Sequence, residues 1–180
     1  MDKMNKTSKT TLGAMAVALS VVAMLLTVVP VMTYASPMIA GMLLIVIVIE
    51  LDKKWGFAVF AAASVLSVLL ASDKQAVILY IMFFGHYPLT KALIEGKIKS
   101  RIIEWLTKFA IFNGAMIFSY FLVVKVFAFP MDEVGDMGKY GSIILLAMGN
   151  VFFPIYDIML SRMVTLYFVR LRKILRKIFK

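Results

Sequence analysis

The stretch VPVMTYASP (residues 29–37) interrupts a run that carries no charge from residue 11 to residue 49. Two prolines, two hydroxyl residues and a tyrosine stand here between long aliphatic segments. The uncharged run is too long for a single membrane helix, because about 20 apolar residues are enough to cross a bilayer. The stretch therefore predicts a connection between two membrane-spanning helices, and with it an all-α, polytopic membrane protein.

The composition of the 180-residue chain favours the same class. Hydrophobic residues make up 62% of it, and the mean hydropathy of +0.93 lies far above that of an ordinary soluble domain. We expect a basic leader (1–10), a six-helix membrane domain (11–169) and a basic amphipathic tail (170–180). The expected helices cover about residues 11–29, a second segment ending near 50, 55–71, 75–94, 102–129, and a sixth segment from about 140.

The net charge of +10 follows the ends of the expected helices. Of the 20 Lys and Arg residues, only Lys74, Lys125 and Lys139 fall at or near the side opposite the termini. Basic loops stay in the cytoplasm, so both termini are predicted to be cytoplasmic and nucleic acid is not expected as a partner. The tail is expected to lie on anionic lipids, because its apolar residues recur every three or four positions: Leu171, Ile174, Leu175, Ile178 and Phe179.

Several chemistries are excluded or disfavoured by what the sequence lacks. There is no cysteine and only one histidine, His86, so thiolate sites and histidine clusters for metals cannot form. No phosphate-binding Gly-x-x-x-x-Gly-Lys-[Ser/Thr] loop, Gly-x-Ser-x-Gly or His-Glu-x-x-His pattern occurs. We therefore expect no cofactor and no metal, and we do not expect the chain to be an enzyme.

The length of the second helix does not decide the role of residues 29–37. Counted from Pro37, residues 38–49 would span only about 18 Å, well short of the hydrocarbon core. The helix could start near Val31 with a kink at Pro37, or the bilayer could be locally thin. Alternatively, residues 30–37 descend into the bundle as irregular backbone, in which case Tyr34 and Ser36 would face an outward cavity.

Small residues recur at a spacing of four on two expected helices. Ala14 and Ala18 lie on the first, Ala58 and Ala62 on the third. Such pairs let another helix backbone approach closely, either within the chain or from a second protein.

In this layout the chain resembles the substrate-binding S-component of an energy-coupling factor (ECF) vitamin transporter. The resemblance rests on length, six helices, cytoplasmic termini, the Ala14-x-x-x-Ala18 motif and the proline-containing stretch before a short second helix. It implies capture of a small molecule, such as a vitamin or precursor, at the plasma membrane of a bacterium. It also implies that Ala14 and Ala18 pack on a transmembrane coupling protein that carries two ABC ATPases. A small secondary transporter and a membrane scaffold without substrate are the alternatives.

Polar residues on the outer half of the helices are candidate substrate contacts, because polar groups inside a membrane usually face the bundle interior or a cavity. We expect one outward-facing pocket formed by Tyr34, Ser36, Gln75, Tyr80, Asn113, Tyr120 and Asn150. Nearby phenylalanines would stack on a planar ligand or serve as packing: Phe83, Phe84, Phe118 and Phe121.

Asp157 is expected deeper in the membrane, toward the cytoplasm. A carboxylate at that depth is costly and normally paired, and its candidate partners are Arg162, Lys91 and His86. We favour a structural ion pair over a proton relay, because Arg162 is close in sequence.

Overall fold

The computed structural model describes residues 5–29, 32–126 and 140–172. Within these residues every regular element is a helix, and six helices are long and apolar enough to cross a membrane. The expected all-α, six-span architecture is therefore confirmed. The six are Lys6–Val28, Met32–Glu50, Lys53–Leu70, Lys74–Lys97, Arg101–Val124 and Gly141–Arg170.

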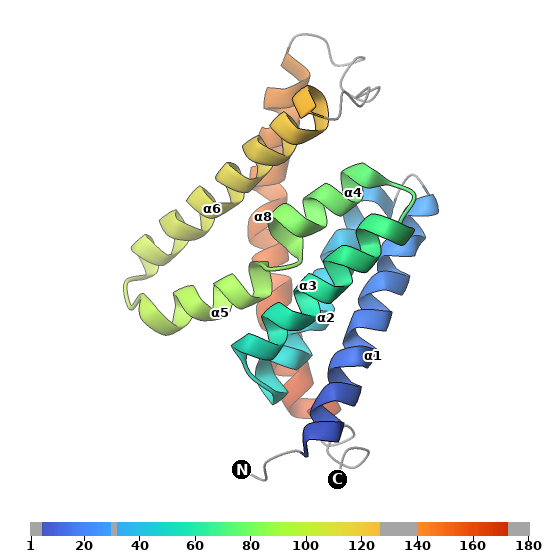
Figure 1. The fold of residues 1–180 in the computed structure, drawn as a ribbon. Helices are drawn as coiled ribbons and strands as arrows, with labels where there is room; N and C mark the ends of the chain where they lie inside the picture. Colours follow the sequence, from blue (N-terminus) through green and yellow to red (C-terminus); the bar gives the residue numbers. More distant parts are fainter. Residues whose placement is uncertain (1–4, 30–31, 127–139, 173–180) are drawn as a thin grey trace.

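The first three helices pack side by side (Figure 1). Helix α1 (Lys6–Leu25) continues into a short 3-10 turn, and α2 (Met32–Glu50) and α3 (Lys53–Leu70) follow. Helix α1 begins at Lys6, so residues 6–10 of the expected leader are helical. No residue there breaks a helix, and the hydroxyls of Thr10 and Thr11 donate to carbonyls one turn earlier.

Most of the stretch 29–37 belongs to α2. Its helical backbone starts at Met32 and runs through Pro37 to Glu50, about 28 Å at the usual helical rise. This length matches the hydrocarbon core, so the interpretation with an early start is correct and irregular backbone over residues 32–37 is wrong. Pro30 and Val31 lie outside the described residues.

The expected fourth helix is divided. Helix α4 (Lys74–Leu79) passes into a π-helical turn, η2 (Tyr80–Phe84), and α5 (Tyr87–Lys97) follows after a turn. Pro88 lies in the first turn of α5, where its missing N–H costs nothing but where the preceding residues are pushed out of the helix. Because α5 extends to Lys97, residues 95–97 are helical and not part of the expected loop.

The last two spans are α6 (Arg101–Phe121), with a π-helical extension η3 (Leu122–Val126), and α8 (Gly141–Leu166), followed by η5 (Tyr167–Leu171). Helix α8 continues through Pro154 without interruption. The expected polar loop at 130–139 and residues 173–180 of the tail lie outside the described residues. The beginning of α1 and the end of η5 lie at the same end of the bundle (Figure 1).

One residue of the expected tail is anchored to the bundle. The Nε atom of Arg172 lies 3.0 Å from Oε1 of Glu50, at the end of α2, and its guanidinium stacks over Phe168. This contact ties the end of the last helix to the α2–α3 turn.

A layer of aromatic side chains connects η2 and α5 with α6 and α8. Buried rings from η2, α5, α6 and α8 pack edge to face or stack, with Phe112 and Phe153 4.7 Å apart between centroids. The layer consists of Phe83, Phe84, Tyr87, Phe112, Phe153 and Tyr156.

Candidate functional site

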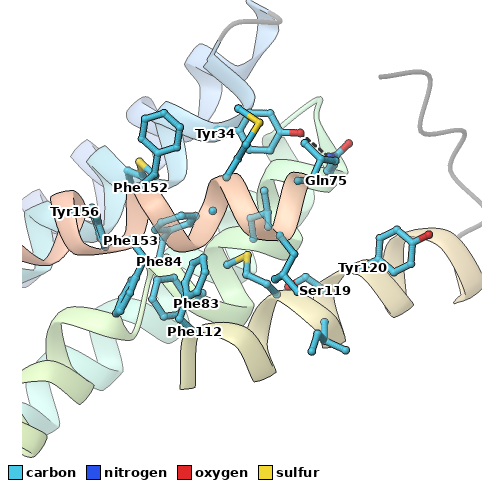
Figure 2. Close-up of a pocket in the computed structure, with 18 of the residues that line it drawn as sticks. Tyr34, Gln75, Phe83, Phe84, Phe112, Ser119, Tyr120, Phe152, Phe153 and Tyr156 are labelled. Atoms are coloured by element: carbon cyan, nitrogen blue, oxygen red, sulfur yellow. Dashed lines mark hydrogen bonds between the residues drawn. The ribbon is translucent and has the colours of Figure 1, made fainter. Parts of the chain in front are cut away.

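A cavity of about 590 Å³ lies between α2, α4, α6 and α8 (Figure 2). The buried rings of the aromatic layer other than Tyr87 form its floor, and Figure 2 shows Phe83, Phe112 and Phe153 close together. More exposed polar side chains from the helix ends opposite the termini form its rim: Tyr34, Gln75, Tyr120 and Ser142.

The π-helical turn η2 places two consecutive phenylalanines in this floor. Phe83 packs against Phe112 and Phe153, with centroids 5.2 and 5.9 Å away, while Phe84 packs against Tyr156 at 5.2 Å. In a regular α-helix consecutive side chains diverge by about 100°. The wider π turn lets both rings line the cavity, and such turns are frequent at functional sites.

Three of the seven predicted substrate contacts line this cavity. They are Tyr34 from α2, Gln75 from α4 and Tyr120 from α6. The Nε2 atom of Gln75 lies 3.5 Å from the Tyr34 hydroxyl across the rim. These three predicted residues therefore lie together at the polar rim of the cavity.

Ser36 and Tyr80 do not reach the cavity. Both are fully buried in helix packing, where Tyr80 lies against the Phe60 ring at 5.8 Å between centroids. Ser36 is two residues from Tyr34, about 200° around the helix, and Tyr80 is five residues from Gln75. Ser36 therefore cannot share a face with Tyr34, and the Tyr80 ring packs on Phe60 instead of lining the cavity with Phe83 and Phe84.

Asn113 and Asn150 pair with each other instead of lining the cavity. Each Nδ2 donates to the other's Oδ1 at 2.8 Å and to the carbonyl one turn earlier on its own helix. The pair joins α6 to α8. It leaves no donor for a ligand, so the prediction of a single pocket with these residues is wrong.

We expect a coupling free energy of about 0.6 kcal/mol between Asn113 and Asn150, the average for such bonds in membrane proteins. The measurement is a double-mutant cycle of Asn113→Ala and Asn150→Ala, with unfolding by SDS titration in micelles. Thr107→Ala on α6 is the control, since that exposed hydroxyl bonds only to its own helix. Strict additivity of the two asparagine substitutions would contradict the assignment.

The lining residues Phe112, Met116, Val123 and Phe153 were not singled out from the sequence. Phe112, Met116, Ser119 and Val123 follow one another at spacings of four, three and four, which places them on one helix face. This spacing was the signal in the sequence from which these lining residues could have been predicted. The predicted aromatic contacts Phe118 and Phe121 are exposed on other faces, whereas Phe83 and Phe84 do line the cavity.

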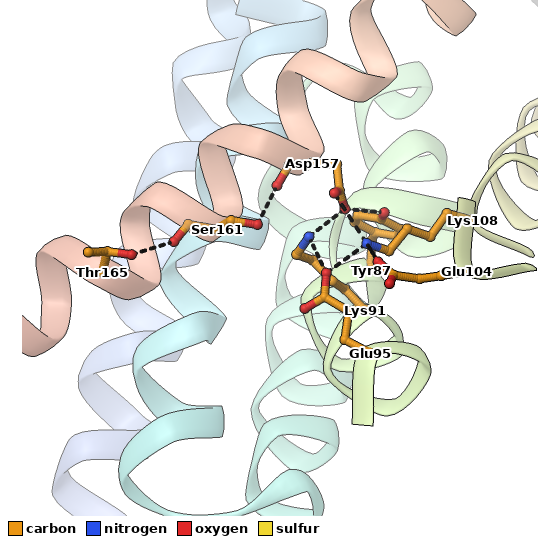
Figure 3. A network of polar contacts seen from close by, with 8 residues as sticks. All are labelled: Tyr87, Lys91, Glu95, Glu104, Lys108, Asp157, Ser161 and Thr165. Atoms are coloured by element: carbon orange, nitrogen blue, oxygen red, sulfur yellow. Dashed lines mark hydrogen bonds and ion pairs between the residues drawn. The ribbon is translucent and has the colours of Figure 1, made fainter. Parts of the chain in front are cut away.

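A charged network lies next to the aromatic layer, and Tyr87 belongs to both. Figure 3 shows its side chains. Oδ1 of Asp157 accepts hydrogen bonds from the Tyr87 hydroxyl at 2.6 Å and from Nζ of Lys91 at 2.7 Å. Its Oδ2 lies 3.3 Å from Nζ of Lys108. The network thus links α5, α6 and α8.

Two further carboxylates complete this network. Oε1 of Glu95 lies 2.7 Å from Nζ of both Lys91 and Lys108, and Oε1 of Glu104 lies 2.6 Å from Lys108. Three carboxylates and two ammonium groups leave a formal charge of −1. A smaller polar cavity of about 290 Å³ borders the network.

Lys91 is therefore the partner of Asp157 among the three candidates. Arg162, the second candidate, is exposed on α8 and makes no ion pair with Asp157. Arg162 does not reach Asp157 because five residues along a helix place two side chains on different faces. The third candidate, His86, has other partners: its Nδ1 lies 3.2 Å from Oγ1 of Thr90, and its Nε2 lies 2.8 Å from the carbonyl oxygen of Met82.

Ala14 and Ala18 are both exposed on the outside of α1, next to Met15 and Leu19. Packing within the chain is therefore wrong as an explanation of this pair. Gly13 instead faces α3, where Trp55 and Val59 lie against it. Ala58 and Ala62 are exposed as well.

Among the described residues, no group of three His, Asp or Glu side chains is arranged to hold a metal. No protein-family model matches the sequence, and neither a curated protein nor a solved structure matches it. Fold and site together define a helical protein with six helices long and apolar enough to cross a membrane, an aromatic cavity and a charged network next to it.

Proposed function

We propose that the protein is a membrane-embedded substrate-binding subunit that captures a small molecule for ATP-driven uptake. The observation that carries the proposal is the cavity of about 590 Å³. Ligand pockets of about 300–1,000 Å³ have mostly apolar walls and a few polar groups that orient the ligand. The aromatic floor and the polar rim of this cavity have that composition.

The proposed orientation puts both termini in the cytoplasm of a bacterial plasma membrane, so that the rim faces outward. It is supported by the distribution of charge. Lys53, Lys54, Lys99 and Arg101 flank connections at the end of the bundle where α1 begins, and basic residues favour the cytoplasmic side.

The proposed energy source is a second protein. The chain contains no nucleotide-binding loop, so a coupling protein with two ABC ATPases would supply the work. The exposed face of α1 that carries Ala14 and Ala18 is the proposed contact, because small side chains permit close helix packing in a membrane.

The test is affinity purification of the tagged full-length chain from its native host in mild detergent, followed by mass spectrometry. We expect a membrane coupling protein and two ABC ATPases to co-purify. Ala14→Trp combined with Ala18→Trp should reduce their recovery at least about tenfold, which corresponds to about 1.4 kcal/mol. A control with Ala110→Trp and Ala147→Trp, exposed alanines on α6 and α8, should retain them.

Other results of the purification would distinguish the two alternative functions, a secondary transporter and a scaffold. A bound small molecule without ATPases would favour a secondary transporter, for which the buried Asp157 network is the supporting observation, since intramembrane carboxylates often serve transport. Recovery of cell-wall or division proteins, with neither ATPases nor ligand, would replace the proposal by a scaffold function.

A further inference from the structure

We propose that the cavity takes an uncharged, flat and largely apolar ring compound, held with its rings on the aromatic floor and one polar group at the rim. This inference rests on the proposed function, since it names the chemical class of the substrate for the same cavity.

The charge of the ligand follows from the lining. None of the described residues around the cavity is charged. The buried ions next to the aromatic layer, Asp157, Lys91 and Lys108, already pair with one another and with nearby carboxylates. An ion brought into such a site would lose its hydration without gaining a partner, which costs several kcal/mol. A neutral ligand avoids this cost.

The shape of the ligand follows from the floor. Phe112 and Phe153 lie nearly parallel, with an interplanar angle of 18°, while Phe83 stands at 79° to Phe112. Because Phe112 and Phe153 cover each other's faces, the floor offers mainly ring edges. The more exposed rings that line the cavity belong to Tyr34, Tyr120 and Phe152. Each edge-to-face or offset pair with a ligand ring is worth about 0.5–1.5 kcal/mol beyond burial, a gain that an acyl chain does not obtain.

The floor is also held in place before a ligand arrives. Phe83 packs on Tyr87 at 4.6 Å between centroids, and Tyr87 donates its hydroxyl hydrogen bond to Asp157. A rigid floor favours a rigid ligand, because neither partner loses much conformational freedom on binding.

The orientation of the ligand follows from the polar rim. The contact between Gln75 and Tyr34 is 3.5 Å long, whereas good hydrogen bonds of this type are about 2.9–3.0 Å. The Gln75 amide can therefore exchange this contact for a polar ligand group at low cost. Ser119 is less suited, because its hydroxyl donates to the Ala115 carbonyl at 2.8 Å.

The test compares three probes of matched size on the full chain in lipid nanodiscs. They are 2-naphthol, its charged counterpart 2-naphthoate, and the flexible alcohol 1-decanol. Binding is measured by equilibrium dialysis, with empty nanodiscs subtracted. We expect 2-naphthol to bind at least about tenfold more tightly than either other probe, as one uncompensated charge or the lost ring contacts would require.

Two variants locate the binding. Ala35→Trp fills the cavity from α2 and should weaken 2-naphthol binding about tenfold or more, while Ala58→Trp on the outer face of α3 should leave it unchanged. Gln75→Ala, at the half-buried rim, should weaken it about three- to tenfold without affecting folding, by removal of one hydrogen bond.

The results distinguish the substrate class from the proposed function. Equal binding of 2-naphthoate would overturn the neutral class, and equal binding of 1-decanol would reveal an acyl-chain site; capture of a substrate would stand in the first case. Binding that Ala35→Trp and Gln75→Ala leave unchanged would place the probe elsewhere and overturn the inference. If no probe binds above empty nanodiscs, the inference fails, and the co-purification of ATPases decides the proposed function separately.

Discussion

Replacement of Lys108 by methionine is expected to destabilise the protein by about 3–5 kcal/mol, the range for breaking a buried ion pair. The Lys108 side chain is only 1% exposed, and its ammonium group contacts Glu95, Glu104 and Asp157. Without it, three carboxylates face Lys91 alone, and the formal charge of the network changes from −1 to −2. Methionine keeps most of the side-chain volume, so the loss reports the charge rather than a cavity.

Asp157→Asn provides the comparison. It leaves two lysines with two glutamates, so the network becomes formally neutral and the cost should be smaller than for Lys108→Met. The free energy of unfolding, measured by SDS titration, should therefore fall in the order wild type, Asp157→Asn, Lys108→Met. Addition of Glu104→Gln to Lys108→Met should restore part of the loss, because it removes one unpaired charge.

Lys97→Met is the matched control, since Lys97 is exposed at the end of α5 and makes no ion pair among the described residues. Its effect should stay within about 0.5 kcal/mol. A loss at Lys108 no larger than at Lys97 would contradict the network.

The second large effect is expected at Gly41 on α2. A methyl group on Gly41 would overlap the backbone carbonyl oxygen of Phe84 and approach the Tyr156 hydroxyl. Because the obstacle is backbone, α2 must move away from η2. We expect Gly41→Ala to cost about 1–3 kcal/mol, as overpacking of a close-packed core does.

Gly114→Ala is the control for helix propensity. Gly114 lies within α6, and a methyl group there would meet no atom within 4 Å. This substitution should stabilise the protein by about 0.5–1 kcal/mol, because alanine loses less backbone entropy in a helix than glycine. Thermal unfolding of both variants in the same detergent checks the opposite signs; a stabilising Gly41→Ala would show that α2 and η2 are not in close contact.

The Gly41 contact also bears on the cavity. Helix α2 contributes Tyr34 to the rim, and η2 contributes Phe83 and Phe84 to the floor. Gly41→Ala should therefore weaken 2-naphthol binding as well, although Gly41 does not line the cavity. This links the packing of the bundle to the dimensions of the site.

The sequence by itself determined the six spans, because the cost of burying charge and unpaired backbone in lipid is a local property of each segment. It also located Tyr34, Gln75 and Tyr120 at one end of the bundle, since each lies near a helix end on the same side. It established that Asp157 needs a partner. These conclusions required only hydropathy, helix length and the order of the segments along the chain.

Only the tertiary structure decided how each helix is rotated about its axis. That rotation buries Ser36 and Tyr80, pairs Asn113 with Asn150, and brings Lys91 and Lys108 to Asp157 in place of Arg162. The π turn at η2, which directs Phe83 and Phe84 into the floor, likewise depends on contacts with α2, α6 and α8. Composition leaves these choices open, because in a chain this apolar every helix face is compatible with lipid, and packing against specific neighbours selects among them.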